Sequence, residues 1–126
     1  MGITGRLSDV PIFDSGVREA LAFTMQQYNQ RRRQSSNVFK VLNVLKVQSQ
    51  LETRDEYDFM VQVVETECQK WAVRGMDFET IQRCEQLPGN QKIQTCYFKV
   101  ILRSPANLAV TACSSSGLPK DLFNSG

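Results

Sequence analysis

The sequence predicts an α+β fold in which one long helix is followed by an antiparallel sheet, and three observations support this prediction. One segment near the N-terminus carries apolar residues at helical spacing, whereas several later segments alternate apolar and polar residues as strands do. All four cysteines lie in the second half of a chain without histidine, a pattern typical of two disulfides. With 126 residues, 41% of them hydrophobic, the chain has the size of one such domain.

The helix is expected over about residues 16–30. A lead rich in helix breakers, residues 11–16, precedes it, and Ser15 is predicted to be its N-cap. The polar stretch 31–37 is expected to end it. Its buried face should consist of the residues at i, i+3 and i+4 spacing, which are Val17, Ala20, Leu21, Thr24, Met25 and Tyr28.

Two long strands joined by the charged turn 52–56 are expected to form a hairpin. In the first strand, residues 39–51, one face is predicted to be apolar and to be interrupted by Asn43 and Ser49. The second strand resumes the same two-residue period at Tyr57. The predicted apolar faces are Phe39, Val41, Leu45, Val47 and Leu51 in the first strand, and Tyr57, Phe59, Val61 and Val63 in the second.

Two further strands are expected towards the C-terminus, over residues 95–102 and 108–113, with a turn at 103–107 between them. The segment 69–83 alternates poorly and could hold a short helix over the sheet, without a firm assignment. Residues 114–126 are rich in Ser and Gly and are expected to be a mobile tail. The predicted organisation is therefore one domain over residues 1–113 and a tail over 114–126.

The cysteines indicate an oxidised framework. Pairing Cys68–Cys84 and Cys96–Cys113 is the most local of the three connectivities that four cysteines allow. A metal site is not expected, because CxxC knuckles and histidines are both missing from the sequence. Disulfides imply an extracellular, secreted protein. The N-terminus lacks the basic and apolar regions of a signal peptide, which we interpret as that of a mature secreted chain.

Composition argues against several classes of function. The formal net charge is only +2, and the basic run Arg31, Arg32, Arg33 has no interleaved aromatic residues for stacking bases. We expect this run to be solvated, with a polyanion contact as the alternative, and we expect no nucleic-acid partner. No segment approaches the roughly 20 apolar residues of a membrane span, so no membrane partner is expected.

An enzymatic function is not expected either. Without histidine, the usual Ser/His and Cys/His nucleophile arrangements cannot form. Glu52, Asp55, Glu56 and Asp58 could supply paired carboxylates, but solvated acidic residues are ordinary in and beside a hairpin turn. No nucleotide-binding motif is present, so no cofactor is predicted.

Several short segments together carry a family resemblance over about residues 3–113. The chain resembles the secreted type 2 cystatins, a family of inhibitors of cysteine proteases. The resemblance implies a cystatin-like fold, with one long helix cradled by a four- to five-stranded antiparallel sheet that includes a short N-terminal strand. It also implies the disulfides Cys68–Cys84 and Cys96–Cys113. The segments that carry it are GVREALAF at 16–23, QYN at 27–29, VLKVQSQL at 44–51, EY at 56–57 and TEC at 66–68.

Inhibitory cystatins bind papain-like cysteine proteases through an N-terminal glycine, a first hairpin of the form Q-x-V-x-G, and a second hairpin carrying Pro-Trp. The resemblance places Gly5 at the N-terminal glycine, with Ile3 and Thr4 entering the protease cleft before it. The first-hairpin motif is replaced by Gln50, Leu51, Glu52, Thr53 and Arg54, and the Pro-Trp position by Ser104, Pro105 and Ala106.

The departures from these motifs predict weak or absent inhibition. Arg54 stands where a glycine lets the backbone approach the cleft, and Glu52 would place a carboxylate in an apolar slot. The only tryptophan, Trp71, is far from the second hairpin in the sequence. In this divergence the chain is similar to the cystatin-related proteins of the male reproductive tract. The alternatives are a working inhibitor of a cathepsin-type protease and a self-associating or strand-swapping binding protein.

A second candidate site follows the helix. Some cystatins inhibit legumain through an asparagine in this loop, and Ser36 and Asn37 lie nearby in the sequence. They are displaced from the family position by one residue and have no acidic follower, so a polar loop is the preferred interpretation.

Overall fold

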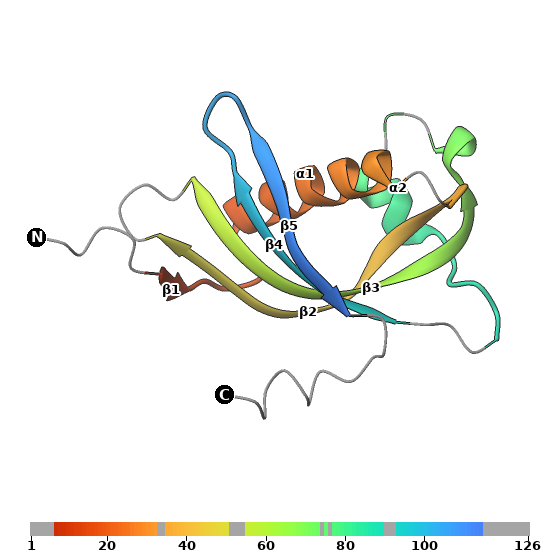
Figure 1. The fold of residues 1–126 in the computed structure, drawn as a ribbon, viewed down its shortest axis with the longest axis horizontal. Coiled ribbons are helices and arrows are strands. Elements are labelled where there is room, and N and C mark those ends of the chain that lie inside the picture. The colour runs from red at the N-terminus through yellow and green to blue at the C-terminus, as the bar shows by residue number, and fades with distance from the viewer. Residues whose placement is uncertain are drawn as a thin grey trace, which may run out of the picture.

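A computed structural model describes residues 7–32, 35–50, 55–73, 75, 77–89 and 93–114. Five antiparallel strands form one curved sheet in the order β1-β2-β3-β4-β5. The long helix α1 lies across the concave face of this sheet (Figure 1). The strands are β1 (Leu7–Asp9), β2 (Asn37–Gln50), β3 (Glu56–Gln69), β4 (Gln94–Ile101) and β5 (Asn107–Ser114), and the main helix is α1 (Ser15–Arg31).

The predicted helix is confirmed within about one residue at each end. The predicted N-cap is wrong by one position, because the side chain of Asp14 accepts the Gly16 amide at 2.8 Å. An extended Asp14 can reach this amide, as an N-cap does. A Cβ at Gly16 would lie 2.2 Å from the hydroxyl of buried Tyr57, so the glycine permits a close approach of α1 to β3.

The predicted apolar face of β3 is confirmed, since Tyr57, Phe59, Val61 and Val63 are all buried against α1 in one core. The prediction for β2 is wrong at Leu45, whose side chain is 39% exposed. Register shifts between Val41 and Asn43 and between Val44 and Lys46 interrupt the ladder. Each bulge changes the alternation of faces, so that Val44 packs against the core while Leu45 faces outwards.

The arginine run is less solvated than we predicted. The guanidinium of Arg31 donates to the Leu108 carbonyl at 2.8 Å, and that of Arg32 lies 4.3 Å from the centre of the Phe39 ring. Both arginines therefore help to attach the end of α1 to the sheet. Arg33 lies outside the described residues.

The segment between β3 and β4 contains a 3-10 helix, η1 (Lys70–Ala72), and a short helix, α2 (Phe78–Arg83). The disulfide Cys68–Cys84 joins the end of β3 to the end of α2, and Cys96–Cys113 joins β4 to β5. Both pairings agree with the predicted ones. A second small core of Val38, Val73, Ile81 and Cys84 holds this region to the sheet. Within the described ranges, no helix is long and apolar enough to cross a membrane.

Candidate functional site

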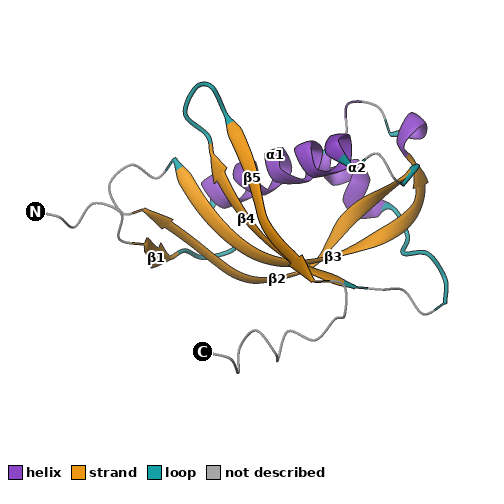
Figure 2. Cartoon of the chain, in the orientation of Figure 1, coloured by secondary structure: helices purple, strands orange, loops and turns teal. Residues whose placement is uncertain are grey.

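The strand register brings described residues that adjoin the three predicted protease-binding segments to one end of the sheet. Leu7, two residues after Gly5, pairs with Gln50 at the end of β2. At the same end Glu56 of β3 pairs with Ile101 of β4, which pairs with Asn107 of β5. The start of β1, the end of β2, the start of β3 and the β4–β5 turn therefore lie at the same end of the sheet (Figure 2). We call segments 3–5, 50–54 and 104–106 the candidate edge.

The structure describes only part of the candidate edge. Gln50 is half-buried at the end of β2, and Ser104, Pro105 and Ala106 are exposed in the turn between β4 and β5. The peptide bond between Ser104 and Pro105 is cis. The other predicted contact residues, namely Ile3, Thr4, Gly5, Leu51, Glu52, Thr53 and Arg54, lie outside the described residues.

Asp55 links the two hairpins of the candidate edge. Its carbonyl accepts the Leu102 amide at 2.8 Å, and its carboxylate lies 3.1 Å from the Arg103 guanidinium. One step along the sheet, Glu56 forms an ion pair with Lys99 at 3.4 Å. These contacts join Asp55 and the start of β3 to the end of β4 and to the residues immediately before Ser104.

Asp58 of β3 places a partly buried, incompletely hydrogen-bonded carboxylate behind this edge. Burial is the main cause that raises the pKa of the Asp58 carboxyl. The nearby Lys99 ammonium lowers this pKa in part, and the Glu56 carboxylate raises it further. One oxygen of this carboxylate, Oδ1, is buried and has no hydrogen-bond partner in the described structure. The ionised form of Asp58 is therefore poorly satisfied in the folded protein.

Sequence reasoning placed Asp55 and Glu56 among solvated turn charges and missed their contacts across the sheet. The signal that could have found them is the opposite sign of Arg103 and Lys99 in the partner strand segment. That signal has meaning only once the register of β3 against β4 is known, and a pattern of alternation alone does not determine that register.

The predicted legumain-type residues lie at the other end of the sheet. Asn37 begins β2, and its side-chain amide donates to the Thr66 carbonyl at 2.7 Å. Its own backbone amide donates to the Ser35 hydroxyl at 3.2 Å. Ser36 is exposed, and its carbonyl accepts the Lys70 amide at 2.8 Å. Insertion of Asn37 into a protease pocket would require the bond to Thr66 to break.

Trp71 also lies at that far end, in η1, with 79% of its surface exposed. An open pocket of about 500 Å³ beside it is lined by the Cys68–Cys84 disulfide and Val73. The single tryptophan follows the end of β3, so the length of β3 separates it from Glu56 and from the β4–β5 turn at the other end of the sheet.

Comparison with known proteins identifies the fold and the family. A family model described as "Cystatin domain" matches residues 5–103. A cystatin of Naja kaouthia is 36% identical over 99 residues, which cover 78% of this chain and 70% of the relative. Cystatin-1 of Crotalus adamanteus is 34% identical over 97 residues, which cover 76% of this chain and 69% of the relative.

Solved structures share the architecture at low sequence identity. The crystal structure of Al-CPI superposes with a TM-score of 0.69 at 14% identity, covering 88% of this chain and 99% of that one. Dimeric human cystatin F gives a TM-score of 0.66 at 16% identity, covering 88% of this chain and 86% of that one. At these identities the likeness establishes the fold alone.

Proposed function

The chain belongs to the cystatin family of cysteine protease inhibitors, and from this premise we propose that it is a secreted member whose candidate edge inhibits papain-like proteases weakly or not at all. The observation that carries the proposal is the residue content of the edge. Glu52 and Arg54 replace the apolar residue and the glycine of the family motif, and Ala106 follows Pro105 where the motif has tryptophan.

These replacements should weaken binding to the protease. A carboxylate buried in an apolar slot without a partner loses its hydration, and a long arginine side chain keeps the turn away from a narrow cleft. Loss of the tryptophan removes the kind of aromatic residue that often dominates binding energy at an interface.

A working inhibitor of a cathepsin-type cysteine protease is the second candidate. It is supported by the register that brings Leu7, Gln50 and the β4–β5 turn to one end of the sheet, and by the contacts of Asp55 with Leu102 and Arg103. In this alternative the protease is contacted by Gly5, by the hairpin from Gln50 to Arg54, and by the altered second hairpin from Ser104 to Ala106. Its cleft accepts Glu52 and Arg54. Secretion is part of either proposal and is supported by the two disulfides.

The test is the double variant Glu52→Val with Arg54→Gly, titrated against active papain and a cathepsin. Removing the desolvated charge and restoring the freedom of the turn should strengthen papain inhibition at least about tenfold, or about 1.4 kcal/mol. A matched control, Glu67→Val with Arg83→Gly, makes the same replacements at exposed positions at the far end of the molecule.

The starting affinity decides between the two candidates. If the unmodified chain already inhibits papain or the cathepsin with nanomolar affinity, the working inhibitor is correct and weak inhibition is wrong. If a correctly folded double variant gains no more affinity than the control, the first hairpin is not what limits binding.

A further inference from the structure

The outer edge of β2 is only partly covered by another strand. β3 pairs along one side of β2. In the part of the chain that the structure describes, β1 pairs with the other side only at Gln48, Ser49 and Gln50, and the Val10 amide adds one bond to the Val47 carbonyl at 3.2 Å. An uncovered strand edge presents backbone donors and acceptors to any second strand that approaches it. The outward-facing backbone groups of Phe39 and Val41 belong to this part of β2.

Two side-chain amides occupy these backbone groups. Asn29 of α1 donates to the Phe39 carbonyl at 3.0 Å and accepts the Phe39 amide at 2.7 Å. Gln82 of α2 donates to the Val41 carbonyl at 3.0 Å and accepts the Val41 amide at 2.8 Å. A primary amide offers one carbonyl and an N–H, as a peptide group does, so each side chain replaces one residue of a neighbouring strand.

The two amides differ in how firmly they are held. Asn29 is completely buried within α1, a helix of 17 residues. Gln82 is half-buried on α2, which has only six residues and depends on tertiary contacts for its stability. The contacts that hold α2 are therefore the contacts that keep the Val41 position covered.

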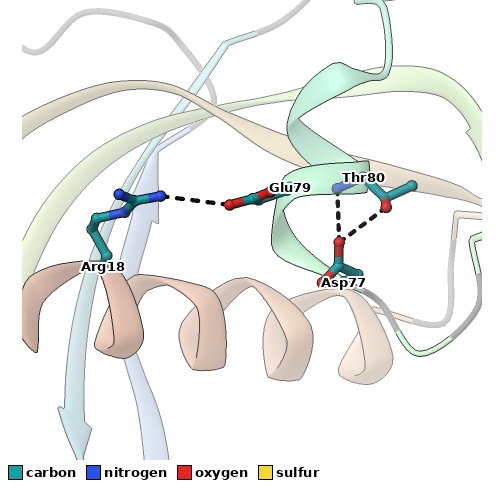
Figure 3. A network of polar contacts seen from close by, with 4 residues as sticks. All are labelled: Arg18, Asp77, Glu79 and Thr80. Atoms are coloured by element: carbon teal, nitrogen blue, oxygen red, sulfur yellow. Dashed lines mark hydrogen bonds and ion pairs between the residues drawn. The ribbon is translucent and has the colours of Figure 1, made fainter. Parts of the chain in front are cut away.

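Contacts with α1, contacts with β2 and contacts within α2 itself hold this short helix. Glu79 of α2 lies 3.6 Å from the Arg18 guanidinium of α1, and Asp77 caps α2 through the amide and hydroxyl of Thr80 (Figure 3). Buried Ile81 packs in the second core, and the Lys40 ammonium of β2 donates to the Cys84 carbonyl at 2.7 Å. The Arg18 pair is exposed, so the core and the disulfide do most of the holding.

We propose that α2, through Gln82, covers the edge of β2 at Val41. Displacement of α2 then exposes β2 as a self-association surface for the same strand of a second copy. Two antiparallel β2 edges related by a two-fold axis near Val41 each offer, at Val41, the donor and acceptor that the other needs. A groove of about 270 Å³ continues the edge; Ile12, Val44 and Leu45 contribute apolar surface to it, beside Asp9 and Lys46. Ile12 and Leu45 are 52% and 39% exposed, so pairing would also cover apolar surface.

The first test replaces Gln82 itself. Gln82→Leu keeps the size of the side chain and removes both hydrogen bonds, while Arg83→Ala changes a neighbouring exposed residue and serves as the control. The Val41 amide should exchange with solvent at least about tenfold faster in Gln82→Leu than in the control, because its acceptor is gone. An unchanged Val41 exchange rate in a folded variant would overturn the proposal.

The second test measures association by sedimentation over a wide concentration range. Unmodified protein should stay monomeric where Gln82→Leu forms dimers. If Gln82→Leu alone keeps α2 in place, adding Cys68→Ala and Cys84→Ala releases it and dimers should form. Circular dichroism checks that β-structure is retained. If both folded variants stay monomeric like the control, the edge is not a self-association surface.

A cross-link separates edge pairing from exchange of β2 between two copies. Asn43 of β2 and Gln62 of β3 are register partners, and their side chains are hydrogen-bonded at 2.9 Å. With Asn43→Cys and Gln62→Cys added to the dimerising variant, edge-paired dimers carry this disulfide within each chain and separate in denaturant without reductant. Covalent dimers would mean that β2 has crossed to the other copy, which would refute edge pairing.

Discussion

Asp58 illustrates at the scale of one residue how a charge behind the candidate edge affects the whole fold. Because burial raises the pKa of its carboxyl in the folded state, the folded protein binds the Asp58 proton more tightly than the unfolded chain does. Ionisation of Asp58 therefore reduces the free energy of unfolding at neutral pH. This loss is recovered as the pH falls through the folded-state pKa of Asp58.

We predict that Asp58→Asn increases the free energy of unfolding at neutral pH, because it removes a charge whose Oδ1 is buried without a partner. The gain should shrink as the pH falls through the folded-state pKa, where the native carboxyl becomes neutral as well. Urea denaturation at neutral pH and below the usual aspartate range measures both values. The exposed Glu85→Gln variant controls for the loss of one acidic charge. Equal gains at the two pH values would contradict this account.

At the scale of elements, α1 and the four long strands could be predicted because their apolar periods are regular. The exposure of Leu45 could not be predicted, because two bulges change the alternation of faces within β2. The sequence pattern gives no signal of where a bulge interrupts the two-residue period. Helix α2 was also uncertain from the sequence. It is held by Ile81, the disulfide and the contacts of Lys40 and Gln82 with β2, and none of these is a local signal.

The Cys68–Cys84 disulfide should stabilise more than its local segment, since it ties α2 to the end of β3. We predict that Cys68→Ala with Cys84→Ala lowers the free energy of unfolding by about 3 kcal/mol, the loop-closure value for a loop of this length. Chemical denaturation followed by circular dichroism measures this loss. The Cys96–Cys113 bond closes a loop of nearly the same length, so the variant Cys96→Ala with Cys113→Ala is the matched comparison. A loss below about 1 kcal/mol in the first pair would contradict the prediction.

At the scale of the whole molecule, the sequence predicted the candidate edge only through the family resemblance. Nothing in the alternation of residues places the start of β1, Gln50 and the turn after Ile101 at one end of a sheet. The register does so. β1 pairs with β2, and the pairing of β3 with β4 joins the β2–β3 hairpin to the β4–β5 hairpin. The contacts of Asp55 with Leu102 and Arg103 depend on the same register and were missed for the same reason.

Deleting residues 1–5 tests the N-terminal part of this edge. The deletion leaves β1, which starts at Leu7, and every residue of the described core. We therefore expect a nearly unchanged thermal midpoint. With a degenerate edge, cathepsin inhibition should be too weak to measure before and after the deletion. Inhibition that is strong in the intact chain and lost on truncation would favour the working inhibitor, with Gly5 as a real contact.

The position of Trp71 has an optical consequence for all of these experiments. Its indole is already largely in water in the native state, so unfolding changes its surroundings little, and its emission is a poor measure of global stability. The same indole stands beside the Cys68–Cys84 disulfide, where it borders the pocket at the end of β3. Because the chain has no other tryptophan, fluorescence excited selectively at tryptophan reports on η1 and its surroundings rather than on the sheet.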